Sequence, residues 1–210
     1  MSPLSATNLR GARWAYGLDL LGVGLFAVSG ALAGIHRGLD LFGIAVIAAV
    51  TGMGGGTLRD MMLGRHPILW VRDPTYLYVI LGAAAIAVMG QGVLPNLETA
   101  FLVADALGLA LFALSGAQAV EQDHAWIIVV VMGTMSGVAG GVIRDVLSGV
   151  APLLLRRDVY ATAAIGGICV YLVLQRLGAG RSVAFAIGII AVVVIRLLSL
   201  ALHWQLPAFA

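Results

Sequence analysis

The stretch TGMGGGTLRD, residues 51–60, places three adjacent glycines just before an Arg-Asp pair inside a long apolar run. Glycine is the weak point of a helix interior, and charged side chains enter a bilayer only at a cost. The same combination returns as SGVAGGVIRD at residues 136–145. Because an unfavourable pattern occurs twice, we infer that it serves the packing or the function of the protein.

The composition around these stretches is that of a membrane protein. Of the 210 residues, 61% are hydrophobic and 10% are charged, with a mean hydropathy of +1.03. Soluble domains carry about 25% charged residues. All twelve basic residues are arginine and they form no long cluster, so no nucleic-acid partner is expected and membrane lipids are the expected surroundings.

Seven apolar stretches have about the length needed to cross a bilayer, which predicts an all-α membrane protein with seven transmembrane helices. The predicted spans are residues 18–36, 42–64, 75–93, 101–120, 125–148, 159–176 and 182–203. The short loops leave no room for a soluble domain. The predicted organisation is an N-terminal segment 1–17, a three-helix repeat 18–95, a second repeat 101–177, a seventh helix 182–203 and a tail 204–210.

The two halves of the chain are copies of each other. DLLGVGLFAVSGALAG from Asp19 and DALGLALFALSGAQAV from Asp105 are identical at ten of sixteen positions. Residues 51–73 match residues 136–158 in the same way. A unit with three spans ends on the opposite side from its start, so the second copy is predicted to be inverted, as in many proteins that move solutes.

The glycine clusters fall near the middle of the second and fifth spans, where they predict a kink or a short unwound segment. Carbonyl groups freed there would have to face protein or water, and they are suitable ligands for cations. The alternative is close helix packing, which small residues permit. The glycines concerned are Gly52, Gly54, Gly55, Gly56, Gly137, Gly140 and Gly141.

Arg59 and Arg144 lie about 10 Å from the middle of their spans, in opposite leaflets. They are predicted either to line a water-filled cavity or to anchor the helices at the interface. Since adjacent helix positions point about 100° apart, a direct pair with the neighbouring Asp60 or Asp145 is not expected.

The expected partners of the two arginines lie in the other half of the molecule or at Asp19 and Asp105. Ser29 and Ser115, near the middle of the first and fourth spans, are secondary candidates because their hydroxyls could bend a helix or face a pore.

No enzyme chemistry is predicted. The four histidines are scattered without ligand spacing, and Cys169 is a lone cysteine in an apolar run. We therefore predict no catalytic residue, no metal site and no cofactor.

The doubled motif, GMGGGTLRD with HPILWVRDP and GVAGGVIRD with APLLLRRD, resembles the prokaryotic trimeric intracellular cation (TRIC) channels, a family also labelled "glycine transporter". The resemblance covers about residues 17–200. It implies a homotrimer with one pore per protomer, kinked second and fifth helices, and passage of monovalent cations, mainly potassium. It implies kinks at Gly54–Gly56 and Gly140–Gly141, with Arg59, Asp60, Arg144 and Asp145 as charged pore or gate residues.

This sequence departs from the family pattern by VAGG in the second copy and by the absence of lysine. A potassium-permeable channel of a prokaryotic plasma membrane is the function that these features favour. A secondary transporter of a small zwitterion such as glycine is the alternative, because helix N-termini and arginine can hold a carboxylate. A membrane scaffold without transport is the third possibility.

Overall fold

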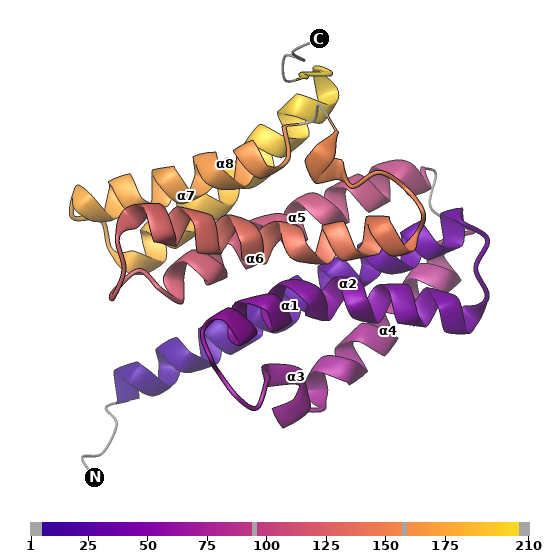
Figure 1. The fold of residues 1–210 in the computed structure, drawn as a ribbon, viewed down its shortest axis with the longest axis horizontal. Helices are drawn as coiled ribbons and strands as arrows, with labels where there is room; N and C mark the ends of the chain where they lie inside the picture. The colour runs from indigo at the N-terminus through magenta and orange to yellow at the C-terminus, as the bar shows by residue number, and fades with distance from the viewer. Residues whose placement is uncertain (1–5, 94–95, 157–158, 206–210) are drawn as a thin grey trace.

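The structure is a computed structural model that describes residues 6–93, 96–156 and 159–205, with the backbone alone for residues 6–15. The described chain is almost entirely helical (Figure 1). Its long helices are α1 (Ala6–His36), α2 (Leu41–Met62), α4 (Thr75–Gly90), α5 (Leu97–Gln118), α6 (Trp126–Leu147), α7 (Ala161–Arg176) and α8 (Arg181–Ala201). Two short helices, α3 (Leu69–Arg72) and η1 (Leu153–Leu155), lie in the connectors.

The seven long helices occupy the seven predicted spans, and the prediction of an all-α membrane protein is confirmed. Five of them are long and apolar enough to cross a membrane, whereas α4 and α7 have 16 residues each. The first helix begins at Ala6, before its membrane-length part, which starts at Tyr16. Of the predicted terminal segments, residues 1–5 and 206–210 lie outside the described residues.

The two repeats pack against each other along their long helices. The first repeat comprises α1, α2, α3 and α4, and the second comprises α5, α6, η1 and α7. Within each repeat the first two helices pack together, α1 on α2 and α5 on α6. The halves meet where α1 packs on α5 and α2 packs on α6, while α8 packs on α7 and α5 (Figure 1).

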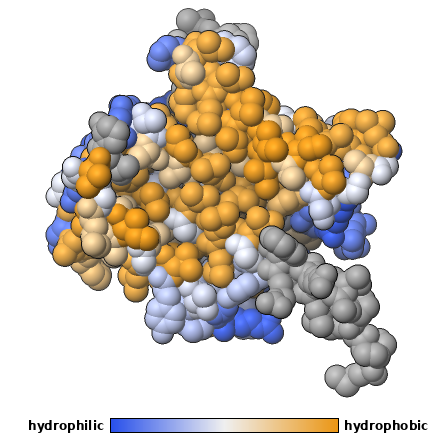
Figure 2. Space-filling model, turned by 180° about the vertical axis from the view of Figure 1, so that it is seen from behind, coloured by the Kyte–Doolittle hydropathy of each residue, from blue (hydrophilic) through white to orange (hydrophobic). Residues whose placement is uncertain are grey.

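The outer surface is apolar, as a bilayer requires. Large hydrophobic side chains such as Phe42, Ile86 and Met89 are 69–82% exposed. Figure 2 shows a broad hydrophobic face with hydrophilic residues gathered toward its margins. Such side chains would be unfavourable in water over so large an area, and they indicate contact with lipid.

The two helices that carry the glycine clusters, α2 and α6, end in the same way. Gly64 follows α2 and Gly149 follows α6, each with a positive φ, of 62° and 68° respectively. In each case the next residue donates its N–H to the carbonyl of the aspartate in the last turn, Arg65 to Asp60 and Val150 to Asp145. A left-handed glycine after the helix is a common way to satisfy its last carbonyls, and it fixes where the connector leaves the helix.

The glycine clusters bring α2 and α6 together along what we term the α2–α6 seam (Thr51, Gly54, Gly55, Ser136 and Gly140). A Cβ added at Gly54 would lie 3.1 Å from the Cα of Gly140. A Cβ at Gly55 would overlap the carbonyl oxygen of Ser136, and one at Gly140 would overlap that of Thr51. The two backbones are therefore packed against each other with no side chain between them.

Of the kink or short unwound segment predicted at these glycines, the unwound segment is wrong, whereas the kink stays a prediction. Residues 41–62 and 126–147 are helical throughout, so the main-chain carbonyls are not released toward a passage. The physical reason is that the opposing helix occupies the space that a missing side chain leaves, which stabilises the glycine helix by close packing. The packing alternative therefore describes the seam in this structure.

The seam predicts a different response from two adjacent glycines. Replacement Gly55→Ala should destabilise the protein by roughly 1–3 kcal/mol, because the added methyl overlaps backbone that cannot yield. Gly56→Ala is the matched control, since its Cβ would meet Phe112 at 3.5 Å, an ordinary contact distance. SDS titrations followed by circular dichroism would measure both variants, and equal losses would contradict the assignment.

Candidate functional site

Two aromatic rings lie where the repeats meet. Phe26 on α1 and Phe112 on α5 stack at a centroid distance of 5.4 Å with an interplanar angle of 12°. The exposed fractions of the two residues are 0% and 1%, so both are fully buried. Phe26 lies midway along the membrane-length part of α1 and covers Gly140, while Phe112 covers Gly55 and Gly56. The pair fills the middle of the α2–α6 seam with apolar atoms.

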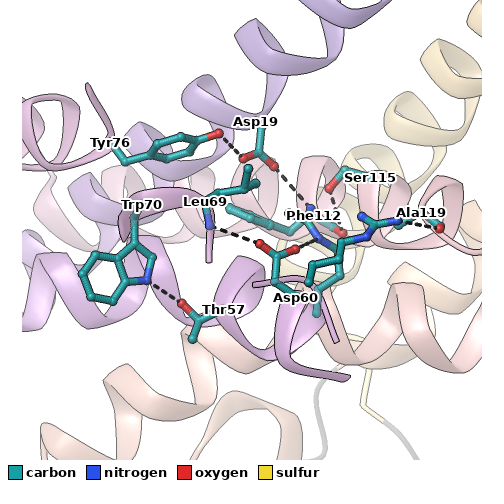
Figure 3. A network of polar contacts seen from close by, with 11 residues as sticks. Asp19, Thr57, Asp60, Leu69, Trp70, Tyr76, Phe112, Ser115 and Ala119 are labelled. Atoms are coloured by element: carbon teal, nitrogen blue, oxygen red, sulfur yellow. Dashed lines mark hydrogen bonds and ion pairs between the residues drawn. The ribbon is translucent and has the colours of Figure 1, made fainter. Parts of the chain in front are cut away.

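A first charged site, consisting of Asp19, Arg59 and Asp60, lies at one end of the seam (Figure 3). Arg59 Nη1 is 3.3 Å from Asp19 Oδ1, and Arg59 Nε is 3.1 Å from Asp60 Oδ1. Tyr76 donates its hydroxyl to Asp19 Oδ2 at 2.9 Å. Asp60 Oδ2 also accepts the N–H of Leu69 at 3.4 Å, which attaches α3 to the end of α2.

A second charged site, consisting of Asp105, Arg144 and Asp145, repeats this arrangement at the opposite end. Arg144 Nη1 is 2.5 Å from Asp105 Oδ1, and its Nε is 2.8 Å from Asp145 Oδ1. Asp145 Oδ2 accepts the N–H of Leu153 at 2.8 Å, which attaches η1 to the end of α6. Arg144 Nη1 also donates to Ser29 Oγ of the first repeat at 2.6 Å.

The pairing of the arginines is partly as predicted. Asp19 and Asp105 are partners, as the sequence indicated. The prediction that Arg59 and Asp60 do not pair directly is wrong, as is that for Arg144 and Asp145. The long arginine side chain runs along the helix, so that Nε faces the carboxylate of the next residue while Nη1 reaches the other helix. Each guanidinium therefore lies between two carboxylates.

The two sites differ in exposure. The Arg59 and Asp19 side chains are 6% and 12% exposed, whereas those of Arg144 and Asp105 are 0% and 1% exposed. The guanidinium of Arg144 also lies over the ring of Phe101, with Cζ 4.5 Å from the centroid. The second site is thus sealed, and the first is partly open.

A small pocket enters the molecule at the first site. Its lining residues are Asp19, Val23, Gly52, Met53, Gly56, Thr57, Ile68, Leu69, Trp70, Tyr76 and Phe112. Asp19 of the first charged site and Phe112 of the aromatic pair both line it, so the pocket lies between the charged site and the apolar centre of the seam. Trp70 donates its indole N–H to Thr57 Oγ1 at 3.0 Å, which holds α3 beside α2 (Figure 3).

The connector beside this pocket carries a further carboxylate. Tyr16 donates its hydroxyl to Asp73 Oδ2 at 2.6 Å, and the N–H of Thr75 bonds Asp73 Oδ1 at 2.9 Å. These hydrogen bonds, with that from Tyr16 the largest contribution, hold the pKa of Asp73 below its ordinary value because they stabilise the carboxylate. The connector therefore keeps a negative charge near this end of the helices.

Most of the predicted site residues are brought together by the fold. Six of the seven glycines are buried in α2 and α6, and the seventh, Gly56, is half-buried beside the pocket. The four predicted Arg and Asp residues form the two charged sites with Asp19 and Asp105. Ser29 contacts Arg144, but Ser115 donates to the Phe112 carbonyl of its own helix at 3.3 Å.

The sequence reasoning missed Phe26 and Phe112 as the centre of the seam, and Tyr76 and Tyr160 as neighbours of the aspartates. Phe26 and Phe112 occupy equivalent positions in the two copies, and that coincidence was the available signal. Tyr160 lies 3.4 Å from Asp105 Oδ1 through its hydroxyl. The two tyrosines stand near span ends, where aromatic residues are common for another reason.

The fold and these sites define a multi-pass membrane protein built from two inverted repeats around a glycine-rich, charged interface. The model of the family described as "Glycine transporter" matches residues 16–91 and 102–176, one match for each repeat. The chain belongs to this family of membrane proteins, and its curated relatives carry the designation UPF0126.

Two curated relatives cover nearly the whole chain. A UPF0126 membrane protein of Vibrio cholerae is 40% identical over 198 residues, which are 93% of this chain and 82% of the relative. The UPF0126 inner membrane protein YadS of Escherichia coli K12 is 38% identical over 93% of this chain and 96% of its own length.

Solved structures give the same assignment. The TRIC trimeric intracellular cation channel orthologue from Rhodobacter sphaeroides has a TM-score of 0.85 at 36% identity, covering 90% of this chain and 98% of that one. A second structure, of a TRIC cation channel studied for its conductance, has a TM-score of 0.81 at 34% identity, covering 92% and 96% of the two chains. The predicted resemblance to TRIC channels is confirmed.

The difference in burial predicts unequal costs for equivalent substitutions. Asp105→Asn should lower stability by roughly 3 kcal/mol or more, since it leaves a sealed arginine with one carboxylate. Asp19→Asn is the matched control and should cost less, because the Asp19 side chain is 12% exposed and that of Asp105 is 1% exposed. SDS unfolding of both variants would measure this, and a larger loss for Asp19→Asn would contradict the stated geometry.

Proposed function

We propose that this protein is a monovalent cation channel, potassium-permeable, that conducts through each protomer of a homotrimer in a prokaryotic inner membrane. The solved structures that it resembles are described as trimeric cation channels, and its Escherichia coli relative is described as an inner membrane protein. The observation that carries the proposal is the pair of charged sites at the two ends of one glycine-rich seam.

The charge of each site supports cation passage. One arginine and two aspartates give the first site a formal net charge of −1, so Asp19, Arg59 and Asp60 together attract a cation although an arginine alone would repel it. The same holds for the second site. In this reading the arginines hold carboxylates at the ends of the path, and glycines Gly52–Gly56 and Gly137–Gly141 border its middle.

The packed seam corresponds to a closed channel. The rings of Phe26 and Phe112 fill the centre, and a hydrophobic constriction opposes ion passage because an ion there would lose its water. Opening would require α2 and α6 to separate or the two rings to turn aside. The glycines suit such a change, because helices without interlocking side chains can slide.

A specific observation keeps the second candidate, a carrier of a small zwitterion such as glycine. The family model is described as "Glycine transporter", and one charged site is sealed while the other is partly open, as a carrier needs. The buried arginines would bind the carboxylate of such a solute.

Currents from purified protein in planar bilayers separate the two functions. A potassium-permeable channel gives discrete current steps in a KCl gradient. Its reversal potential is shifted from zero toward the equilibrium potential of potassium. Protein-free bilayers are the control. Saturable glycine uptake with counterflow and no current steps would overturn the channel proposal.

The closed seam predicts a gain of function. Phe112→Ala should raise open probability or potassium flux several-fold, because it removes half of the apolar centre. Phe185→Ala is the matched control, because Phe185 lies on α8, away from the seam. Its ring packs on that of Tyr171, with 6.4 Å between the ring centroids. Flux into proteoliposomes would compare them, and an equal effect of both substitutions would contradict a barrier at Phe112.

A further inference from the structure

A fully buried arginine lies on α8, the helix that belongs to neither repeat. Arg196 is 1% exposed, and α8 is long and apolar enough to cross a membrane. Its Nη1 donates to the carbonyl oxygen of Val159 at 3.3 Å, whereas its Nε and Nη2 have no hydrogen-bond partner among the described residues. The ion pairs in the described part of the chain do not include it. A buried charge without a carboxylate is costly in a membrane helix, so the charge itself needs a functional explanation.

Tyr160 connects this arginine to the second charged site. The guanidinium Cζ of Arg196 lies 5.0 Å from the centroid of the Tyr160 ring, in a cation–π contact. The hydroxyl of the same ring is 3.4 Å from Asp105 Oδ1. Tyr160 is itself 1% exposed. The positive charge of Arg196 and the negative charge of Asp105 therefore contact the same buried ring.

The first charged site has a neutral ring in the corresponding place. Tyr76 stands there as Tyr160 does at the second site, with its hydroxyl 2.9 Å from Asp19 Oδ2. Its ring packs on that of Tyr16, with 6.1 Å between the centroids and an interplanar angle of 87°. The tyrosine beside the aspartate thus has an aromatic neighbour at the first site and a cationic neighbour at the second.

This difference makes the two ends unequal in charge. Each charged site alone consists of one arginine and two aspartates, with a formal net charge of −1. The guanidinium of Arg196 is always protonated in proteins, and it brings the formal charge of the second end to zero. A buried charge acts through a low dielectric and is only weakly screened by salt. The second end therefore attracts a cation less than the first.

We propose that Arg196 determines the direction in which cations pass more easily. Potassium is concentrated at the end formed by Asp19, Arg59 and Asp60, and it is not concentrated at the end beside Arg196. At equal and opposite voltages, the current that enters at the first end exceeds the current that enters at the second. The inference rests on the proposed function, because it treats the two charged sites as the ends of one cation path.

Single-channel currents in symmetric KCl test this proposal. At equal and opposite voltages the larger current should exceed the smaller by roughly threefold, whichever way the protein has inserted. Arg196→Met should bring this ratio close to unity, because both ends then have the same formal charge. Arg196→Lys keeps the positive charge and should keep the ratio of the parent. Arg196→Gln removes the charge with a polar side chain, and it replaces Arg196→Met in the comparison if the apolar variant does not fold.

Arg156→Gln is the matched control. It removes the same charge at the same end of the helices, but Arg156 is exposed, so salt screens its charge and the ratio should not change. Equal currents in both directions from the parent would overturn the inference, and so would the parent ratio in folded Arg196→Met. Absence of any potassium current from the parent would refute the proposed channel as well, so the two failures are distinguishable.

Discussion

The direct contact between the backbones of α2 and α6 is the constraint on which the rest of the structure depends. It exists because Gly54, Gly55 and Gly140 offer no side chain where the two helices meet. With the helices so close, the aromatic rings of α1 and α5 cover the contact, and the arginine at the end of each helix reaches the aspartate of the helix beside it. Any larger residue in the seam would separate these partners.

The charged sites have a cost that their geometry offsets. A buried guanidinium without a partner would be expensive in the membrane, and here each lies between two carboxylates. Each second aspartate also anchors a connector helix through a backbone N–H. The sites thus join the ends of the long helices to the connectors.

The helices and their inverted repetition could be predicted from the sequence, because apolar length and self-similarity are properties of the chain itself. The partners Asp19 and Asp105 were also foreseeable, since they are the acidic residues within the adjacent spans. Whether the glycine clusters break their helices or pack closely could not be predicted from the sequence. A glycine cluster weakens an isolated helix, but Gly55 is held by the carbonyl of Ser136 on another helix, and that tertiary contact decides between a break and a close packing.

The neighbouring Arg-Asp pairs were missed for a related reason. The 100° rotation between adjacent positions describes Cα–Cβ directions, whereas Arg59 bonds Asp60 through the Nε of a long, flexible side chain. The difference between Ser29 and Ser115 could not be predicted at all. The two copies have the same residue there, and the asymmetry belongs to the conformation.

The central claim is that solute passes along the α2–α6 seam past Gly56. In a protein with Cys169→Ala, the replacement Gly56→Cys adds a side chain where there is room beside Phe112, within the pocket. A positively charged thiosulfonate reagent should then block the potassium current, while the same treatment of Ile86→Cys on the lipid face should not. A current that persists after complete modification of Gly56→Cys would contradict the account.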